Sequence, residues 1–427
     1  MRQNAANWLE LADKVWNFRR DVLTAAESEA LLGRRGALRQ LLAEKADAGR
    51  LKLGIESLEE SLRLCGGAIY PKTSLTENVE FFLVAAIVIL GIRTYFVQPF
   101  KIPTNSMWPT YYGMTAENLP ASAPAPGLPE RIFRLFAYGA QRHEAIAPRS
   151  GTVEAAFFGN RRLAYTLKSG RSWLIFPTKV KEYTFYVDGT PVSVRVPEDF
   201  SGLDSSSEGP GILAQTFFAD EAAFETYWDE QVRSGRFQTR EVQVDEANGT
   251  FVRALVLPLP RPVRAGQPVV RFDVLTGDQL FVDRVSYHFT RPQVGQGFVF
   301  RTDHIPGIGL DEYYIKRLVG LPGDVLEVKA PVLYRNGKPI TGAAAFDFNA
   351  RQTAPYGGYT YGDSIYGARF LFKDKTLTIQ PGGFFAMGDN SGNSSDGRVW
   401  GFVPEKDVIG RPLFIYYPFT RRWGVAR

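Results

Sequence analysis

Cysteine and histidine are scarce in this sequence, and their scarcity excludes several kinds of site. Cys65 is the only cysteine among 427 residues, so neither an internal disulfide framework nor a thiolate metal cage can form. The three histidines, His143, His288 and His304, lie far apart, and none falls in an HExxH or similar ligand spacing. The sequence therefore gives no support for a metal, and we expect no cofactor.

A strong charge bias is also missing. The chain has 50 basic and 45 acidic side chains, a formal charge of +5, so nothing in the charge balance points to a nucleic-acid partner. At roughly 150 residues per domain, the length suggests two or three structural units. The 31 Phe, 19 Tyr and 41 Gly favour strands and tight turns over a helical bundle. We expect a largely β protein after the first hundred residues.

The N-terminal region, residues 1–78, is predicted to be a helical extension. It is rich in Ala, Leu, Glu and Arg at helical spacing, as in residues 25–33 and 38–53. No apolar segment follows the first basic residues, so it does not resemble a cleavable signal peptide. It is either a cytoplasmic interaction module or a solvated helical extension.

Long apolar runs are scarce, and the longest covers only the 12 residues Phe81–Ile92. Extended through Val97 it would reach about 25 Å as a helix, if Arg93 snorkels toward the interface. Tyr95 and Phe96 suit an interfacial aromatic belt. We predict one transmembrane helix over residues 79–98, with a buried core helix as the alternative. The flanking charges are too balanced to fix its orientation.

The rest of the chain divides at a Pro/Ala-rich linker, residues 120–129. Hairpin signals at Asp188-Gly189 and Asn248-Gly249, and one helix near 220–233, predict an inserted β-rich domain over residues 116–268. Strand patterns resume at Val269. We expect a mainly β catalytic domain of antiparallel sheets, with a first part over 99–115 and a second part over 269–427.

Three segments differ from ordinary strand and turn sequence: residues 102–110 around Ser106, residues 314–324 around Lys316, and residues 387–398. A serine nucleophile needs a neighbouring base that is unprotonated near neutral pH, and a buried lysine can serve. In a strand, Lys316 shares a face with Tyr314 and Leu318, whereas Arg317 points to the other face. Lowering a lysine pKa from about 10.4 by roughly three units costs about 4 kcal/mol, which packing must offset.

Supporting roles follow for neighbouring residues. Arg317 is expected to pair with Asp389 or Asp396 and to brace the loop that carries Ser394. Ser394 could then orient Lys316 through a hydrogen bond. The backbone N–H of Ser106 and the hydroxyl of Thr104 are expected to stabilise the oxyanion, with Asn105 a weaker candidate.

In combination these segments closely resemble bacterial signal peptidase I, the Ser/Lys enzyme that removes signal peptides. The matching motifs are Pro103-Thr-Asn-Ser-Met-Trp-Pro-Thr110, Lys316-Arg317 with Gly320-Leu-Pro-Gly-Asp324, and Gly388-Asp-Asn390 with Asn393-Ser394 and Asp396-Gly-Arg398; flanking matches are Gly277-Asp278, Val282-Asp283 and Trp400–Pro404. The resemblance covers about residues 79–114 and 270–415.

The resemblance implies a nucleophile at Ser106, a general base at Lys316, an oxyanion partner at Thr104 and a lysine-positioning residue at Ser394. It implies that Arg317, Asp389, Asp396 and Arg398 hold the catalytic loops. It also implies a bacterial inner-membrane enzyme with a single span and an extracytoplasmic active site. Its substrates would be exported preproteins with small residues at the first and third positions before the cut.

Several positions depart from the family pattern. Thr104 and Asn105 stand where the family commonly has Ser and a small residue, Gln296 replaces a usual acid, and Gly397 replaces a usual serine. The inserted region makes the separation of Ser106 and Lys316 several-fold longer than is typical, and charged helices stand where some relatives have a first membrane segment.

Two other functions remain open at this point. One is a Ser/Lys autoprotease of the self-cleaving repressor type, although such proteins are soluble and begin with a DNA-reading domain. The other is a catalytically silent membrane scaffold whose inserted domain binds partners. A penicillin-recognising Ser/Lys enzyme is disfavoured, because Pro109 stands where its SxxK motif needs lysine.

Overall fold

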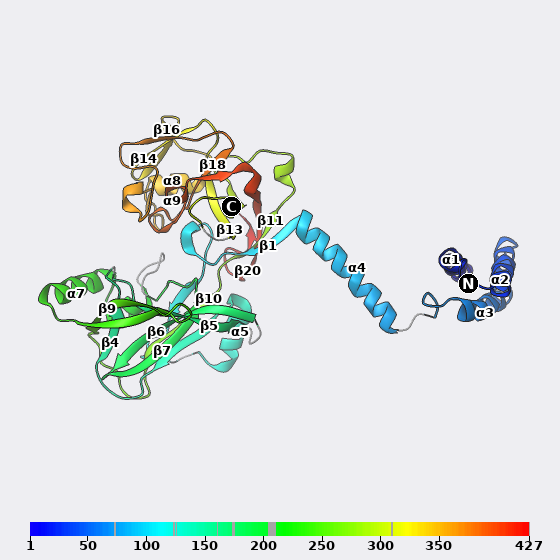
Figure 1. The fold of residues 1–427 in the computed structure, drawn as a ribbon, viewed down its shortest axis with the longest axis horizontal. Helices are drawn as coiled ribbons and strands as arrows, with labels where there is room; N and C mark the ends of the chain where they lie inside the picture. Colours follow the sequence, from blue (N-terminus) through cyan, green and yellow to red (C-terminus); the bar gives the residue numbers. More distant parts are fainter. Residues whose placement is uncertain are drawn as a thin grey trace. The chain divides into compact units, whose positions relative to one another are not determined.

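The computed structural model describes residues 1–71, 74–122, 124, 126–159, 161–172, 176–203, 211–308 and 311–426. The chain divides into two compact units, Met1–Gly91 and Ile92–Arg427. The second unit consists mainly of antiparallel sheets, which confirms the predicted fold class (Figure 1). Ala123 and Ala125 of the predicted linker lie outside the described residues.

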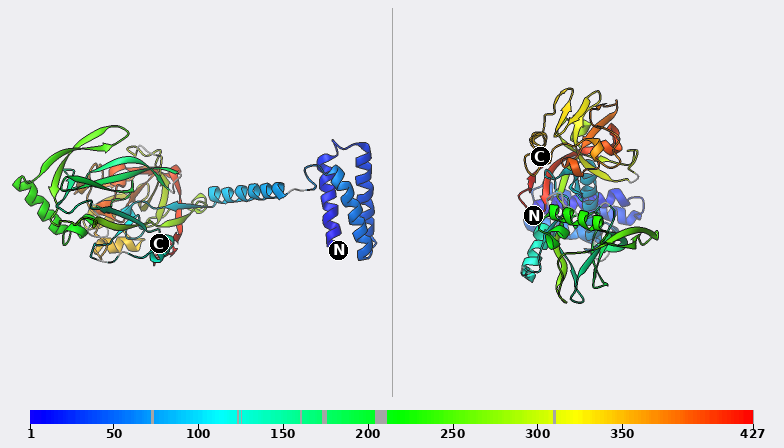
Figure 2. Two further views of the ribbon diagram at one scale, coloured as in Figure 1. Left: turned by 90° about the horizontal axis from the view of Figure 1, so that it is seen from below. Right: turned by 90° about the vertical axis from the view of Figure 1, so that its left-hand side faces the viewer.

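The first unit begins with helices that lie side by side (Figure 2): α1 (Arg2–Arg19), α2 (Ala25–Ala43) and α3 (Ala48–Cys65). Thr24 and Glu27 form a capping box at the start of α2, and the Asp47 carboxylate caps α3. The apolar stripes of the three helices meet in one core that includes Leu9, Leu38 and Leu58. These helices agree with the helical extension expected from composition.

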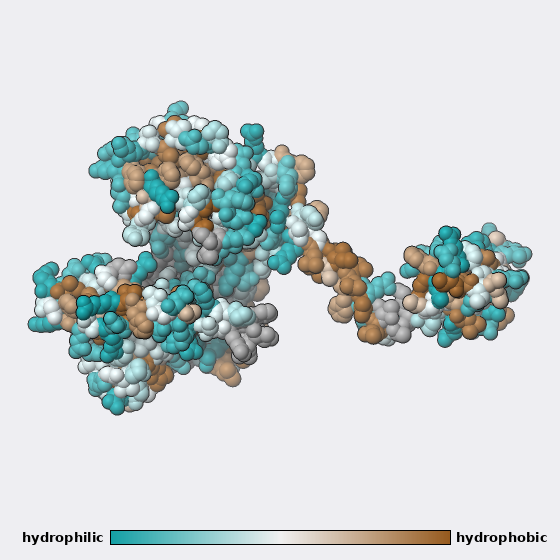
Figure 3. Space-filling view, in the orientation of Figure 1, coloured by the Kyte–Doolittle hydropathy of each residue, from teal (hydrophilic) through white to brown (hydrophobic). Residues whose placement is uncertain are grey.

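Helix α4 (Ser74–Tyr95) follows, and it is the one helix of the described residues that is long and apolar enough to cross a membrane, over Glu77–Tyr95. Its visible face is largely hydrophobic (Figure 3), and none of the candidate span is buried against protein. The predicted span extended to residue 98. Val97 and Gln98 are instead the first residues of strand β1 (Val97–Lys101), because they pair with Asp283 and Val282.

The sheet that carries the candidate site has the strand order β1-β11-β20-β12-β13-β18-β19, with β21 paired to β20. Strands β12 and β18 are almost wholly buried, and β13 is buried from Lys316 to Gly320. Their bounds are β11 (Gln279–Asp283), β12 (Gly297–Arg301), β13 (Tyr313–Gly320), β18 (Gly383–Met387), β19 (Phe402–Pro404), β20 (Val408–Tyr417) and β21 (Gly424–Val425).

A smaller sheet packs beside it in the order β16-β15-β14-β17, and Asn336-Gly337 forms the turn between β15 and β16. Its strands are β14 (Val325–Lys329), β15 (Val332–Arg335), β16 (Lys338–Pro339) and β17 (Thr376–Thr378). Short helices complete this half: α8 (Ala344–Ala350), α9 (Gly397–Trp400), and the single turns η1 (Asn105–Met107), η2 (Ser286–His288), η3 (Gly362–Ser364), η4 (Ser391–Asn393) and η5 (Glu405–Asp407).

The intervening region forms two further sheets, β2-β10-β3 and β4-β9-β8-β5-β6-β7. Both predicted hairpins are present, β6 with β7 and β8 with β9. The strands are β2 (Thr115–Asn118), β3 (Gln141–Ile146), β4 (Val153–Phe157), β5 (Tyr165–Ser172), β6 (Phe176–Val187), β7 (Thr190–Pro197), β8 (Gln238–Asp245), β9 (Thr250–Pro258) and β10 (Pro268–Leu275).

The helix predicted near 220–233 is α7 (Glu221–Ser234), capped by Asp220. Two helices were not predicted, α6 (Ile212–Phe217) and α5 (Leu128–Tyr138). Helix α5 begins inside the segment read as a stiff linker, because Pro129 is tolerated in the first turn of a helix, where its missing N–H has no intrahelical partner.

Residues Gly277 and Asp278 tie both ends of the loop that carries Ser106 to the sheet. The backbone N–H of Ile102 donates to Asp278 O at 2.9 Å, and the N–H of Asp278 donates to Tyr112 O at 2.8 Å. Gly277 is essential to this approach, because a Cβ at that position would lie 1.9 Å from Ile102 O. The intervening region therefore leaves and rejoins the part of the chain with the large sheet at a closely packed point.

The Gly277 contact predicts that Gly277→Ala lowers the free energy of unfolding by about 1–3 kcal/mol and displaces the Ser106 loop, because backbone must move to admit the methyl group. Denaturant unfolding measures the loss. Gly159→Ala is the matched control, since nothing lies within 4 Å of a Cβ built there. An unchanged stability of Gly277→Ala would contradict this packing.

Candidate active site

Ser106 sits in the single turn η1, on a loop between β1 and β2. The Asn105 side chain clamps the loop, donating to Met114 O at 3.0 Å and accepting from the N–H of Gly113 at 2.7 Å. Both ends of that amide are thus engaged with the loop itself. Asn105 acts here as a brace, a role the sequence did not suggest.

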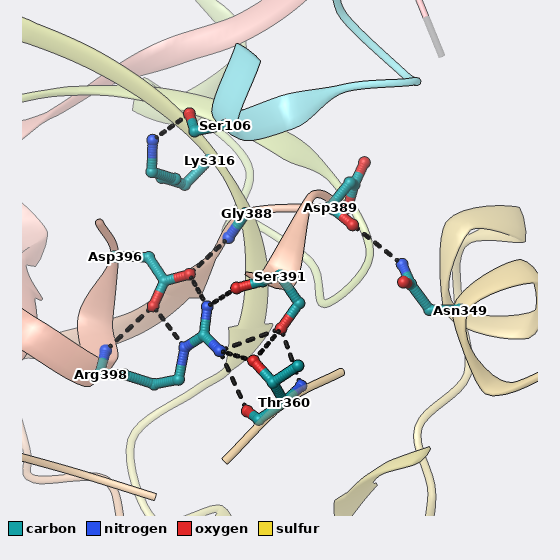
Figure 4. A network of polar contacts seen from close by, with 9 residues as sticks. All are labelled: Ser106, Lys316, Asn349, Thr360, Gly388, Asp389, Ser391, Asp396 and Arg398. Atoms are coloured by element: carbon teal, nitrogen blue, oxygen red, sulfur yellow. Dashed lines mark hydrogen bonds and ion pairs between the residues drawn. The ribbon is translucent and has the colours of Figure 1, made fainter. Parts of the chain in front are cut away.

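Lys316 lies on β13 and is 5% exposed. Its Nζ donates to Ser106 Oγ at 2.6 Å, although 210 positions separate the two residues (Figure 4). The Tyr314 ring, two residues away on the same face, has its centroid 5.3 Å from Nζ. Burial lowers the pKa of Lys316 to about 8, against the opposing influence of Asp396 and Asp389.

Arg317, on the other face of β13, pairs with Asp389 through two hydrogen bonds of 2.7 and 2.5 Å. Its third donor reaches Gly295 O at 2.6 Å, and Thr110 donates to the same carboxylate at 2.5 Å. This network joins the loop of Ser106 to the loop after β18. Of the two carboxylates expected to pair with Arg317, the structure shows Asp389. Thr110 also belongs to this hydrogen-bond network, which the sequence did not reveal.

Asp396 pairs instead with Arg398, and neither side chain has any exposed surface. The guanidinium donates to the carboxylate at 2.8 and 2.7 Å, and it also binds Thr360 and Ser391 (Figure 4). Burial pushes the pKa of Asp396 up, but Arg398 outweighs that influence and holds it below its usual value. The backbone N–H of Gly388 also donates to Asp396 at 3.0 Å, so this pair fixes the loop next to Ser106.

That loop contacts the segment around Ser106 directly. The backbone N–H of Asn390 donates to Ser106 O at 3.1 Å and its side chain donates to Asn105 O at 3.0 Å. Gly388 permits the contact, because a Cβ there would lie 2.4 Å from Ser106 O. Asn390 belongs to the matched motif Gly388-Asp-Asn390, but the sequence analysis gave it no role. Asn349, which donates to Asp389 O at 3.2 Å, is a further support that no motif or spacing marks.

Ser394 is buried beside this contact, 4% exposed. A Cβ on Gly388 would lie 2.2 Å from its hydroxyl oxygen, which places Ser394 against the same loop. Within the described part of the chain, that oxygen has no hydrogen-bond partner. The structure therefore brings Ser394 to the site without the hydrogen bond to Lys316 that we predicted.

Thr104 is exposed and lines a cleft of about 700 Å³ together with Ser106. Strand residues Tyr313, Tyr314 and Ile315 border the cleft, and Asp199 reaches it from the loop after β7. An open cleft over a buried amine and a half-buried hydroxyl is a place where an extended polar substrate can meet the two groups.

Elsewhere in the described chain, Asp303, His304 and Asp407 bring ligand-type atoms within 4.8 Å of one another. His304 Nδ1 lies 2.8 Å from Asp407 Oδ1, so this group forms a polar contact between the loop after β12 and the turn η5. Linear spacing had not placed His304 near any carboxylate.

Comparison with known proteins places these features in a family. Residues 257–417 match the family described as signal peptidase, peptidase S26. The chain is 35% identical over 151 residues to probable signal peptidase I-1 of Synechocystis, covering 35% of this chain and 66% of that protein. Signal peptidase IB of Staphylococcus aureus is 30% identical over 154 residues, covering 34% of this chain and 71% of that protein.

A crystal structure of a signal peptidase I from Enterococcus faecalis aligns with 26% identity and a TM-score of 0.22, covering 29% of this chain and 97% of that one. The chain spans between 57% and 66% of the length of the matched relatives from Synechocystis and Leptolyngbya laminosa. The identity and coverage of the Staphylococcus relative, together with the matched residues 257–417, show that the chain belongs to the signal peptidase I family.

Proposed function

We propose that this protein is a membrane-anchored serine endopeptidase that removes N-terminal signal peptides from exported preproteins. The observation that carries the proposal is the 2.6 Å hydrogen bond between Ser106 Oγ and Lys316 Nζ, made by a buried amine whose pKa is near 8. A lysine with a pKa close to working pH can act as a general base toward a hydroxyl. Membership of the signal peptidase I family supports the substrate class.

In this mechanism neutral Lys316 accepts the Ser106 proton while Oγ attacks the carbonyl carbon before the cleavage site. The resulting ammonium then donates that proton to the leaving amine, and an ester between Ser106 and the signal peptide remains. Water deacylates the ester, with Lys316 again as base. The same amine thus serves both half-reactions, and no further titrating group is required.

Charge that develops on the carbonyl oxygen needs fixed donors. The backbone N–H of Ser106 and the hydroxyl of Thr104 are our candidates, since Thr104 faces the cleft beside Ser106. Asn390 and the clamp at Asn105 would keep these donors in place. Ser394 is proposed to position Lys316 by packing, and the two Arg–Asp pairs hold the surrounding loops.

Substrate is proposed to bind as an extended strand. Residues Tyr313–Lys316 of β13 pair only with β12, and β18 joins on the other side from Arg317 onward, in the part of the chain that the structure describes. β1 is likewise at the edge of its sheet. An extended peptide can add to such strand edges through main-chain hydrogen bonds. Small residues at the first and third positions before the cut are the expected preference.

The proposed topology has one span, α4, with the active site on the extracytoplasmic side of a bacterial inner membrane. β1 begins at Val97, two residues after α4 ends at Tyr95, so catalysis takes place close to the bilayer. Residues 1–78 are then a cytoplasmic helical region, and residues 116–268 an inserted domain within the catalytic half.

Replacing either member of the dyad tests the proposal. Ser106→Ala and Lys316→Ala are expected to lower preprotein cleavage by roughly three orders of magnitude or more, because they remove the nucleophile or its base. Gel assays on purified protein in detergent measure this. Lys329→Ala, which removes an exposed lysine on β14, is the matched control. Normal cleavage by either dyad variant would rule out the mechanism.

The pH profile tests the base itself. Because the pKa of Lys316 is about 8, we expect kcat/KM to rise about tenfold per pH unit below pH 8 and to level off above it. Steady-state cleavage of one peptide between pH 6 and pH 10 would show the rise. A rate already maximal at pH 6 would exclude a lysine base.

The lowered pKa of Lys316 also makes stability depend on pH. A folded pKa of about 8 against 10.5 for a free lysine means that, below pH 8, the folded state is penalised by about 3 kcal/mol, and that the penalty fades as pH rises toward 10.5. Lys316→Met removes the penalty and loses one hydrogen bond. Its unfolding free energy should therefore exceed wild type by about 2 kcal/mol at pH 7.

The gain should shrink toward zero near pH 10, and denaturant unfolding at both pH values measures it. A Lys316→Met variant that is less stable than wild type at pH 7 would show that the ammonium is stabilised in its pocket, contrary to the pKa near 8.

A further inference from the structure

Helix α5 presents its apolar face outward. Its apolar side chains fall on one side of the helix, and the largest are well exposed: Leu128 69%, Phe133 60% and Phe136 71%. On the opposite side, Arg134 turns inward, 2.5 Å from Glu117 and 3.2 Å from Asp273. A helix on the surface of a soluble domain has the reverse arrangement, with its apolar stripe against the core.

The end of β20 and the residues after it extend this surface. Tyr417 donates through its hydroxyl to Leu135 O, and the N–H of Phe419 donates to Ala137 O at 3.0 Å, so residues 417–419 lie against α5. Phe419 is 59% exposed. The α5 surface, defined as α5 with residues 417–419, therefore gathers exposed aromatic side chains from two distant parts of the chain.

A basic groove borders the α5 surface. A cavity of about 330 Å³ lies between α5 and the β2-β10-β3 sheet, lined by Arg131, Arg134, Arg142 and Asp273 among others. Arg134 and Arg142 share the Asp273 carboxylate, whereas Arg131 is exposed and has no ion pair within the described residues. The Nε of Arg134 is buried without a hydrogen-bond partner in that same part of the chain. Arg131 is therefore the donor that this border leaves open to an anion.

We propose that the α5 surface is a second membrane contact, which lays the apolar face of α5 into the interface of an anionic bilayer while Arg131 and the groove bind lipid phosphate. Exposed Phe and Leu on one face with Arg at its border is the pattern of helices that lie in the membrane plane. Arg134 and Arg142 are paired with Asp273 and Glu117, and Glu130 adds a third carboxylate near Arg134, so exposed Arg131 is the cation left at this border for a lipid phosphate.

The chain's own geometry selects lipid as the occupant. The second compact unit, Ile92–Arg427, contains α5 and starts within the last turn of the candidate span. If that helix crosses a membrane, the chain tethers this unit to the bilayer surface. Figure 1 draws α5 beside β10, on the inserted region and outside the residues that match the signal peptidase family. The inserted region would thus fix how the cleft faces the membrane.

The test uses the full chain with Cys65→Ser, which leaves an engineered cysteine as the only thiol. A fluorescent label at Phe136→Cys is compared with the same label at Lys338→Cys, an exposed position on β16. The protein is reconstituted in vesicles of phosphatidylcholine with phosphatidylglycerol that contain lipids with brominated acyl chains. Quenching at position 136 should exceed that at 338 by roughly threefold or more.

Two results would overturn the inference, whatever the outcome of cleavage assays. One is equal quenching at positions 136 and 338. The other is a label at 136 that stays accessible to a water-soluble quencher until a second protein is added, which would assign the face to a protein partner. Arg131→Glu should weaken quenching at position 136 in vesicles that contain phosphatidylglycerol and leave it unchanged in vesicles of phosphatidylcholine alone. An equal effect in both kinds of vesicle would contradict the proposed role of anionic lipid.

Discussion

The proposed active site depends on the exclusion of water from the amine of Lys316. Lys316 is buried next to two carboxylates that would each favour its ammonium form, yet its pKa falls to about 8 because desolvation dominates. Each carboxylate has its own guanidinium: Asp389 binds Arg317, and Asp396 binds Arg398. A carboxylate already neutralised by an arginine attracts a nearby ammonium less strongly. The two ion pairs therefore do more than hold loops, since they also allow the lysine to remain neutral.

These pairs explain how strands far apart in the sequence form one site. Arg317 joins β13 to the loops of Thr110 and Asp389, while Arg398 fixes the chain that leads from Gly388 to Ser394. Removing one partner of a buried pair leaves an uncompensated charge that costs several kcal/mol. The loop of Ser106 gains a third attachment at Gly277 and Asp278. These attachments hold Ser106 beside Lys316 although a long region separates the two residues in the sequence. The entropic cost of closing that long loop grows only slowly with its length.

Much of this could be predicted from the sequence. Strand periodicity alone placed Lys316 and Arg317 on opposite faces, and motif order placed Ser106 near Lys316. Pairing partners were harder, because Asp389 and Asp396 lie in one loop and only the fold decides which arginine each one meets. Asn105, Asn390 and Asn349 act through backbone contacts that leave no periodic signal. Helix α5 escaped prediction because the prolines before it and at its start suggested a linker, and because its large apolar side chains are exposed and do not pack on a core.

The most direct test of this account is the pKa of the Lys316 amine in the intact, detergent-solubilised protein. Carbon NMR of ε-labelled lysine follows the titration, and Lys316→Met identifies the resonance by its loss. The account predicts a midpoint near pH 8 for this one lysine. A midpoint above pH 10, in the ordinary range of exposed lysines, would contradict it.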